Sequence, residues 1–191
     1  TKQGTVENGK RLRLSHTCAL RYQDGTWVQS AVLDDNIYLV SGGQSEFAIL
    51  LPEKPTAKEQ FAAQELQHFF KEATGVKLPV QKEGTQELPD KYLSVGNTEA
   101  SEAANIKPSA EQVGSNGFVI KSVDNDCYIK GYGDMGTRNG VYEWLSQCFD
   151  YECYAVDCIK ITKTTEKILP KGKMIHTDGL VHQEELNVVD T

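Results

Sequence analysis

The chain has 191 residues, of which 39% are hydrophobic and 25% charged, so it can bury the core of one ordinary domain and is neither a fibre nor a disordered tail. Its formal net charge of −7 and pI near 5.1 disfavour a nucleic-acid partner, because no cluster of Lys and Arg reverses the charge locally. No apolar run approaches the roughly 20 residues that a bilayer span needs, and we expect no membrane span.

The N-terminal part, residues 1–34, is polar and turn-rich, and we expect an extension with short strands. It begins without an initiator Met, a basic n-region or an apolar h-segment, which favours either a removed signal peptide or a piece of something longer. Residues 37–40 and 47–51 then read as two strands, separated by a glycine-containing break.

The clearest predicted element is a helix over residues 56–74. Thr56 and Glu59 form a capping box directly after a proline. Apolar residues recur at helical spacing through Ala62, Leu66 and Phe70, and Gly75 supplies the left-handed stop. This pattern is typical of an amphipathic helix that covers a sheet.

Shorter elements are expected in the middle of the chain. Strands are predicted at 76–80 and 92–95, a short helix at 98–104 and a loop at 107–115. A β-hairpin is predicted for 118–130, because two apolar segments flank the turn sequence Asp124-Asn125-Asp126.

A second good helix is predicted at 136–148, with Trp144 on its buried stripe, followed by short strands up to residue 169. The predicted fold class is α+β, a mixed β-sheet with two main helices packed on one face. We expect residues 35–170 to form this domain and residues 171–191, which are polar, to be a C-terminal tail or linker.

The five cysteines do not predict a metal site or a disulfide scaffold. They lack the paired short spacings of a zinc site, and no histidine lies within a few residues of them. Their odd number leaves at least one unpaired in a monomer. We expect small buried or edge thiols, and neither a metal nor a cofactor.

Gly131, Gly133 and Gly136 match the G-x-G-x-x-G pattern of dinucleotide sites. The strand before them is the second arm of a predicted hairpin, and about 55 residues follow, which is too few for the rest of a dinucleotide fold. The favoured interpretation is that these glycines allow a sharp turn and close packing of the helix on the sheet. A nucleotide site remains a less favoured alternative.

Acidic residues are plentiful, but most are expected in turns, and no G-x-S-x-G sequence or Cys–His pair indicates a nucleophile. Aromatic side chains could stack on the apolar face of a sugar ring. Candidates outside the helix faces are Tyr22, Trp27, Tyr132, Tyr151 and Tyr154, although packing is favoured for each.

Three groups of residues together resemble a known family. The first is Phe61-Ala-Ala-Gln-Glu-Leu66 with Ala73-Thr-Gly-Val-Lys-Leu78-Pro79-Val80 and Tyr92-Leu-Ser-Val-Gly96-Asn97-Thr98. The second is Asn116-Gly-Phe-Val-Ile120, Tyr128-Ile-Lys-Gly131 and Gly136-Thr-Arg-Asn-Gly140-Val141-Tyr142-Glu143-Trp144-Leu145, and the third is Cys153-Tyr154 with Asp157. Over residues 35–170 this order resembles the N-terminal domain of bacterial α-glucuronidases, and also the related domain that precedes β-N-acetylhexosaminidase barrels.

The resemblance implies a non-catalytic accessory domain of a secreted or periplasmic carbohydrate-active protein. Its partner would be a C-terminal (β/α)₈ catalytic barrel of the parent chain, with an oligo- or polysaccharide as a possible ligand. If this domain lends residues to the rim of a substrate cleft, those expected to touch sugar are Asp134, Arg138 and Tyr154. A stand-alone carbohydrate-binding module is the alternative.

Overall fold

The computed structural model describes residues 11–13, 19–30, 36–85, 87–155, 158–177 and 180–184. The chain divides into two compact units, Thr1–Ile37 and Tyr38–Thr191. In the first unit, an antiparallel sheet in the order β1-β2-β3 comprises Arg11–Arg13, Ala19–Gln23 and Thr26–Ser30.

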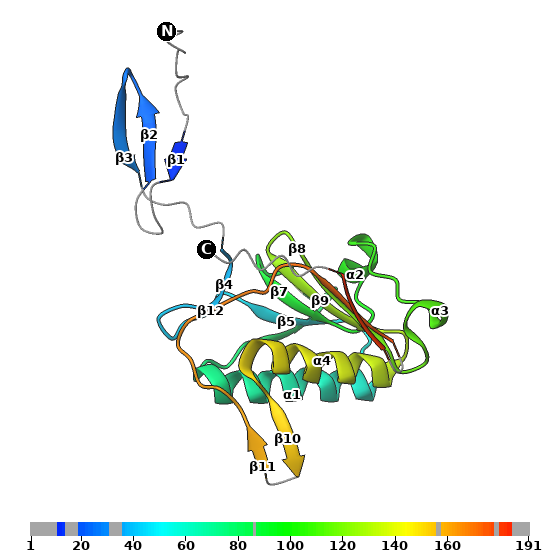
Figure 1. Cartoon of the computed structure of the whole chain (residues 1–191). Helices are drawn as coiled ribbons and strands as arrows, with labels where there is room; N and C mark the ends of the chain where they lie inside the picture. Colours follow the sequence, from blue (N-terminus) through cyan, green and yellow to red (C-terminus); the bar gives the residue numbers. More distant parts are fainter. Residues whose placement is uncertain are drawn as a thin grey trace. The chain divides into compact units, whose positions relative to one another are not determined.

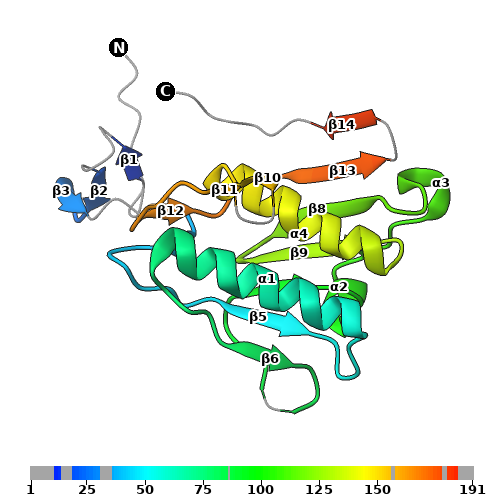
Figure 2. The same ribbon diagram turned by 90° about the horizontal axis from the view of Figure 1, so that it is seen from below.

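The second unit contains a seven-stranded mixed sheet in the order β14-β13-β8-β9-β7-β5-β6 (Figures 1 and 2). Its strands are β5 (Ala48–Leu51), β6 (Val80–Lys82), β7 (Tyr92–Val95), β8 (Phe118–Val123), β9 (Asp126–Gly131), β13 (Lys173–Thr177) and β14 (Leu180–Glu184). β5 pairs in parallel with β6 and β7, and β7 with β9, whereas β8 pairs antiparallel with β9 and β13. The predicted α+β class and the predicted 118–130 hairpin are confirmed.

Two long helices, α1 (Ala57–Thr74) and α4 (Asp134–Phe149), lie side by side on one face of this sheet (Figures 1 and 2). Both were predicted. The opposite face is covered by α2 (Glu99–Ala103) and α3 (Ala110–Val113). α3 lies where the sequence indicated a loop; it is a single turn started by Ser109, whose side chain accepts a hydrogen bond from the Gln112 N–H.

Local sequence explains the bounds of α1. The Thr56 side chain accepts from the Glu59 N–H at 3.2 Å, and the Glu59 side chain accepts from the Thr56 N–H at 2.8 Å, so the capping box is complete. Gly75 ends the helix at φ 78°, a left-handed conformation that favours glycine.

Both faces of the sheet are buried, because α1 and α4 cover one face and α2 and α3 cover the other. Successive strand residues point to opposite faces, so each strand contributes to both layers of the core. On the side of α1 and α4, Ile49 and Ile129 pack in the core with Leu66, Phe70 and Trp144, which are each at most 1% exposed. On the other side, a second cluster comprises Leu50, Tyr92, Ile106, Val113, Val119 and Tyr128. The core position expected for Trp144 is therefore confirmed.

Two small strand pairs complete the unit. β4 (Tyr38–Val40) pairs with β12 (Lys167–Ile168), and β10 (Glu152–Ala155) forms a hairpin with β11 (Cys158–Lys160) that projects past the layer of α1 and α4 (Figure 1). The sheet also continues beyond residue 170, because β13 pairs with β8 from Lys173 to His176. Among the described residues, no helix combines the length and apolarity needed to cross a membrane.

Candidate functional site

A polar cleft lies at the carboxyl ends of the parallel strands β5, β7 and β9. The chain leaves β5 for α1 on one face and leaves β7 for α2 on the other, so the strand connections diverge between them. Ligand sites of open α/β sheets form at such points. The cleft, here called the carboxyl-edge cleft, has a volume of about 610 Å³. It is lined by Pro52, Lys54, Thr56, Glu59, Asn97, Glu102, Lys107, Pro108, Lys130, Gly131, Tyr132, Gly133 and Thr137.

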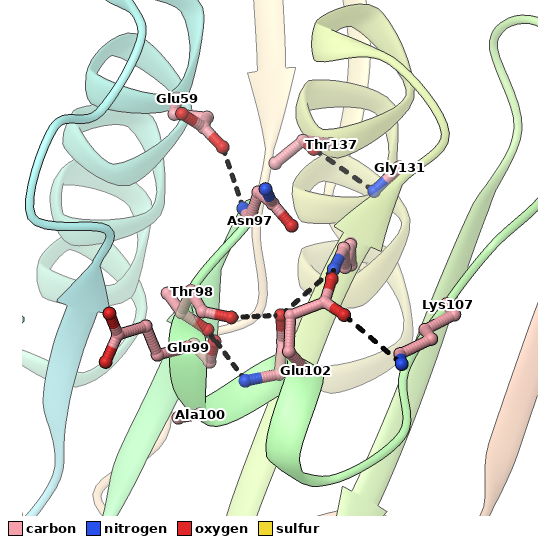
Figure 3. Close-up of polar contacts among 12 residues, drawn as sticks. Glu59, Asn97, Thr98, Glu99, Ala100, Glu102, Lys107, Gly131 and Thr137 are labelled. Atoms are coloured by element: carbon pink, nitrogen blue, oxygen red, sulfur yellow. Dashed lines mark hydrogen bonds and ion pairs between the residues drawn. The ribbon is translucent and has the colours of Figure 1, made fainter.

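Glu59 connects the start of α1 to the end of β7 through hydrogen bonds at the wall of this cleft. Its side chain is buried, and besides the Thr56 N–H it accepts the Asn97 N–H at 2.8 Å (Figure 3). Gly96 faces it closely: a Cβ there would lie 2.2 Å from the Glu59 Oε1, and its φ is +90°. Both carboxylate oxygens are therefore committed to backbone groups.

A cluster of charged and polar side chains joins the end of β9 to α2. The Lys130 side chain is only 8% exposed, and its Nζ donates to the Glu102 carboxylate and, at 3.2 Å, to the Ser101 Oγ. The Lys107 Nζ lies 3.6 Å from the other oxygen of Glu102 (Figure 3). Hydrogen bonding and charge attraction from Lys130 lower the pKa of Glu102, so this carboxyl is ionised at neutral pH.

The glycine motif forms the turn from β9 into α4. A Cβ on Gly131 would lie 2.2 Å from the Thr137 backbone N, and one on Gly136 would lie 2.2 Å from the Gly117 carbonyl oxygen. The Gly131 N–H donates to the Thr137 Oγ1 at 3.1 Å (Figure 3). These contacts support the packing interpretation of the motif. β9 is the second arm of an antiparallel hairpin and not the first strand of a dinucleotide fold.

The cleft does not supply the acid–base pair of a glycosidase. Such a pair needs one carboxyl that stays protonated and a second that is free to act as base or nucleophile. Glu102 is held ionised by Lys130, and Glu59 is occupied by two N–H donors. Within the described ranges, no group of three or more His, Cys, Asp or Glu side chains could hold a metal ion.

The residues expected to touch sugar lie on two separate elements. Asp134 is the first residue of α4, but its side chain lies outside the described part of the chain. Arg138 lies one turn further along, and its Nε is buried without a hydrogen-bond partner among the described residues. Tyr154, on β10, is 68% exposed and bonds through its hydroxyl to Glu152.

Asp134 and Arg138 lie on neighbouring turns of α4, and Tyr154 lies on β10, the strand that follows this helix. Neither Arg138 nor Tyr154 lines the carboxyl-edge cleft.

Sequence reasoning missed Lys130 and Glu102 as a cluster. The available signal was a lysine at the end of the otherwise apolar segment Tyr128-Ile129, where a buried charge requires a partner. The partner lies in α2, 28 residues earlier, and no sequence spacing connects the two.

The cysteines agree with the expectation of buried or edge thiols. Cys127 and Cys148 are buried, Cys153 and Cys158 are exposed, and these four are free; Cys18 lies outside the described residues. Burial raises the pKa of Cys127 to about 12, so this thiol is not a nucleophile at neutral pH.

Comparison with known proteins identifies the class of domain. Residues 27–144 match the family described as glycosyl hydrolase family 67 N-terminus. This match covers more than half of the chain, and the chain belongs to that family. The resemblance to the N-terminal domain of a glycoside hydrolase is thereby confirmed.

Several solved structures show a distant likeness. BtGH115A, a GH115 4-O-methyl-α-glucuronidase with specificity for decorated arabinogalactans, matches 73% of this chain and 18% of its own at 14% identity and a TM-score of 0.45. A mutant β-hexosaminidase of Streptomyces plicatus, in complex with its product GlcNAc, matches 70% and 23% at 13% identity and a TM-score of 0.37. A GH138 enzyme targeting pectin rhamnogalacturonan II matches 53% and 10% at 16% identity and a TM-score of 0.36.

The chain thus spans between 10% and 23% of the length of these solved structures. No curated protein sequence matches it.

Proposed function

We propose that the chain is a non-catalytic accessory domain of a glycoside hydrolase, which packs against a (β/α)₈ catalytic barrel on the same polypeptide. The observation that carries this proposal is the family match over residues 27–144, because the family is by its description the N-terminal part of glycosyl hydrolases. The sugar bond would then be broken on the barrel, and this domain would stabilise or complete it.

The chemistry of the carboxyl-edge cleft supports a non-catalytic role. Its two glutamates hold backbone groups and a buried lysine in place through their carboxylate oxygens. The polar groups of the cleft therefore act in folding the domain. This role needs no cofactor.

The β10–β11 hairpin is the surface that we propose for contact with the barrel. It projects past the helical layer (Figure 1) and exposes Tyr154 and Ile159, at 68% and 38%. Exposed aromatic and aliphatic side chains on a projecting element are typical of a contact with another domain. In this arrangement Tyr154 would lie at the rim of the substrate cleft.

The same proposal includes export of the protein to the periplasm or the exterior. Its support is the family alone, because polysaccharide substrates lie outside the cell. Accumulation of the protein in the periplasmic or culture fraction checks this point, and retention in the cytoplasm would contradict it.

Hydrolysis assays test the non-catalytic role. We expect the chain alone to release no nitrophenol from a panel of nitrophenyl glycosides above the buffer rate, while the full polypeptide hydrolyses at least one of them. Turnover by the chain alone that survives purification and is abolished by Glu102→Gln would overturn the proposal.

A further inference from the structure

A second hollow lies along the outer side of α4. It has a volume of about 400 Å³ and lies between the outer stripe of α4, strand β13 and the start of β10. The Gln147 side chain of α4 contacts the Met174 sulfur of β13 at 2.9 Å, which places β13 along this side of the helix. We call the hollow the α4–β13 groove. Its volume falls in the range of about 300–1,000 Å³ found for small-molecule pockets.

Two stacked pairs of aromatic rings line this groove. His176 stacks on Phe118 with ring centroids 5.0 Å apart and planes 3° from parallel, and Tyr142 stacks on Tyr151 at 5.6 Å and 10°. In each pair one ring is buried, namely Phe118 and Tyr151, and the other is partly exposed. The buried ring supports the exposed one, so a ligand would meet rings that are already held in place.

These ring positions are also fixed by the fold. His176 and Phe118 are cross-strand partners of β13 and β8, so the sheet register sets their stacking. The Tyr142 hydroxyl donates to the Glu65 carboxylate of α1 at 2.8 Å, which anchors this side chain across the two helices.

Polar groups lie between the rings. Asn139, Glu143 and Ser146 follow one another at helical spacing along the groove side of α4, and they offer an amide, a carboxylate and a hydroxyl. Among the described residues, no Lys or Arg lines the groove. A phosphorylated or acidic ligand would therefore meet Glu143 without a compensating Lys or Arg. The Asn139 amide donates to the Asn116 carbonyl oxygen at 3.4 Å and the Glu143 carboxylate accepts from the Gln147 amide at 3.1 Å. A wholly apolar ligand would exclude water from the remaining donor and acceptor positions of these two side chains.

We propose that the α4–β13 groove binds a neutral sugar ring. The sugar packs its apolar face against the partly exposed ring of Tyr142 or His176 and directs its hydroxyls to Asn139 and Glu143. A pyranose has the required pair of surfaces, an apolar face of C–H groups and an edge of hydroxyl groups. The inference rests on the proposed function in its choice of a saccharide ligand, and it gives the accessory domain a substrate-holding role of its own.

Titration of the chain with cellotetraose, xylotetraose and chitotetraose, followed by amide NMR, tests this assignment. We expect saturable shifts for at least one of the three, centred on Asn139, Glu143 and His176. Asn139→Ala and His176→Ala should each weaken the binding by about tenfold. The matched control is Tyr132→Ala, which removes an aromatic ring that is 53% exposed at the carboxyl-edge cleft and should leave the affinity unchanged.

The proposal is overturned if none of the three saccharides produces saturable shifts in the groove at millimolar concentration. It is equally overturned if Asn139→Ala leaves the affinity unchanged or if Tyr132→Ala weakens it as much. Asn139 is partly exposed, so its replacement keeps the test valid even where His176→Ala does not fold. Absence of sugar binding would leave docking on a barrel intact, whereas failure of docking would leave sugar binding measurable.

Discussion

Gly133 differs from the other two glycines of its motif in what surrounds it. Gly131 and Gly136 each lie where a Cβ would overlap backbone atoms at 2.2 Å. Among the described residues, a Cβ added at Gly133 would meet just the Ser115 carbonyl oxygen at 3.6 Å, an ordinary contact, and the φ of −130° is open to any residue. Packing therefore requires two of the three glycines.

This difference predicts opposite outcomes for two substitutions. Gly136→Ala should lower the free energy of unfolding by about 1–3 kcal/mol, because the methyl group must displace the Gly117 backbone. Gly133→Ser should be neutral or stabilise by a few tenths of a kcal/mol, roughly the gain of a side-chain cap. Urea unfolding of both variants measures this, and equal destabilisation would contradict the distinction between Gly133 and Gly136.

Asp126, at the start of β9, makes the stability of the folded chain depend on pH. Its Oδ1 accepts the Tyr92 N–H at 2.9 Å, yet burial raises the pKa of its carboxyl above the ordinary value. A raised pKa means that ionisation favours the unfolded chain, so the stability associated with Asp126 is present below the ordinary pKa of about 4 and is lost as the pH rises through the shifted value.

Asp126→Asn should remove this loss while keeping an oxygen that can accept the Tyr92 N–H. We expect the variant to match the wild type in stability at pH 3 and to exceed it at pH 7. Comparing the two proteins at each pH cancels the titration of other carboxyls. A wild type more stable than the variant at pH 7 would contradict the account.

At the scale of elements, the carboxylates of two buried glutamates accept hydrogen bonds from backbone N–H groups at the start of a helix. Glu59 holds the start of α1 and the end of β7 through the N–H groups of Thr56 and Asn97. Glu83, in the loop after β6, accepts the Glu99 and Ala100 N–H groups at the start of α2, at 2.7 and 2.9 Å. Each carboxylate thus fixes a helix relative to a different strand connection.

Replacing Glu59 should therefore cost more than removing an ordinary helix cap. Thr56→Ala should lower the free energy of unfolding by about 1 kcal/mol. Glu59→Gln should lower it by about 2–3 kcal/mol, because one of two buried N–H groups then faces an amide donor. Denaturant unfolding checks the order, with Glu72→Gln on the exposed side of α1 as a neutral control. If Glu59→Gln lowers the free energy of unfolding no more than Thr56→Ala does, Glu59 does not join α1 to the end of β7 as described.

Elements specified by local sequence could be predicted, and those specified by distant partners could not. α1 was predictable because its cap, its apolar stripe and its terminal glycine are all contiguous. β13 was missed because its segment is polar and its partner strand β8 lies far earlier in the chain. The carboxyl-edge cleft could not be predicted for the same reason, because Glu59, Glu102 and Lys130 come together only when β5, β7 and β9 align in parallel.

At the scale of the whole molecule, a two-stranded hairpin lies apart from the seven-stranded sheet. The β10–β11 hairpin extends past α1 and α4 (Figure 1), and its described residues are mostly exposed. A short two-stranded hairpin is marginally stable by itself. The proposed barrel would bury this hairpin and so account for its exposed Tyr154 and Ile159.

Amide hydrogen exchange in the chain alone and in the full polypeptide tests the docking claim most directly. The amides of β10 and β11 should be protected at least about tenfold more strongly in the full polypeptide, while those of β6, at the far edge of the sheet, should exchange at the same rate in both. Equal exchange of the hairpin amides in the two proteins would contradict an accessory domain that packs on a catalytic barrel through β10 and β11.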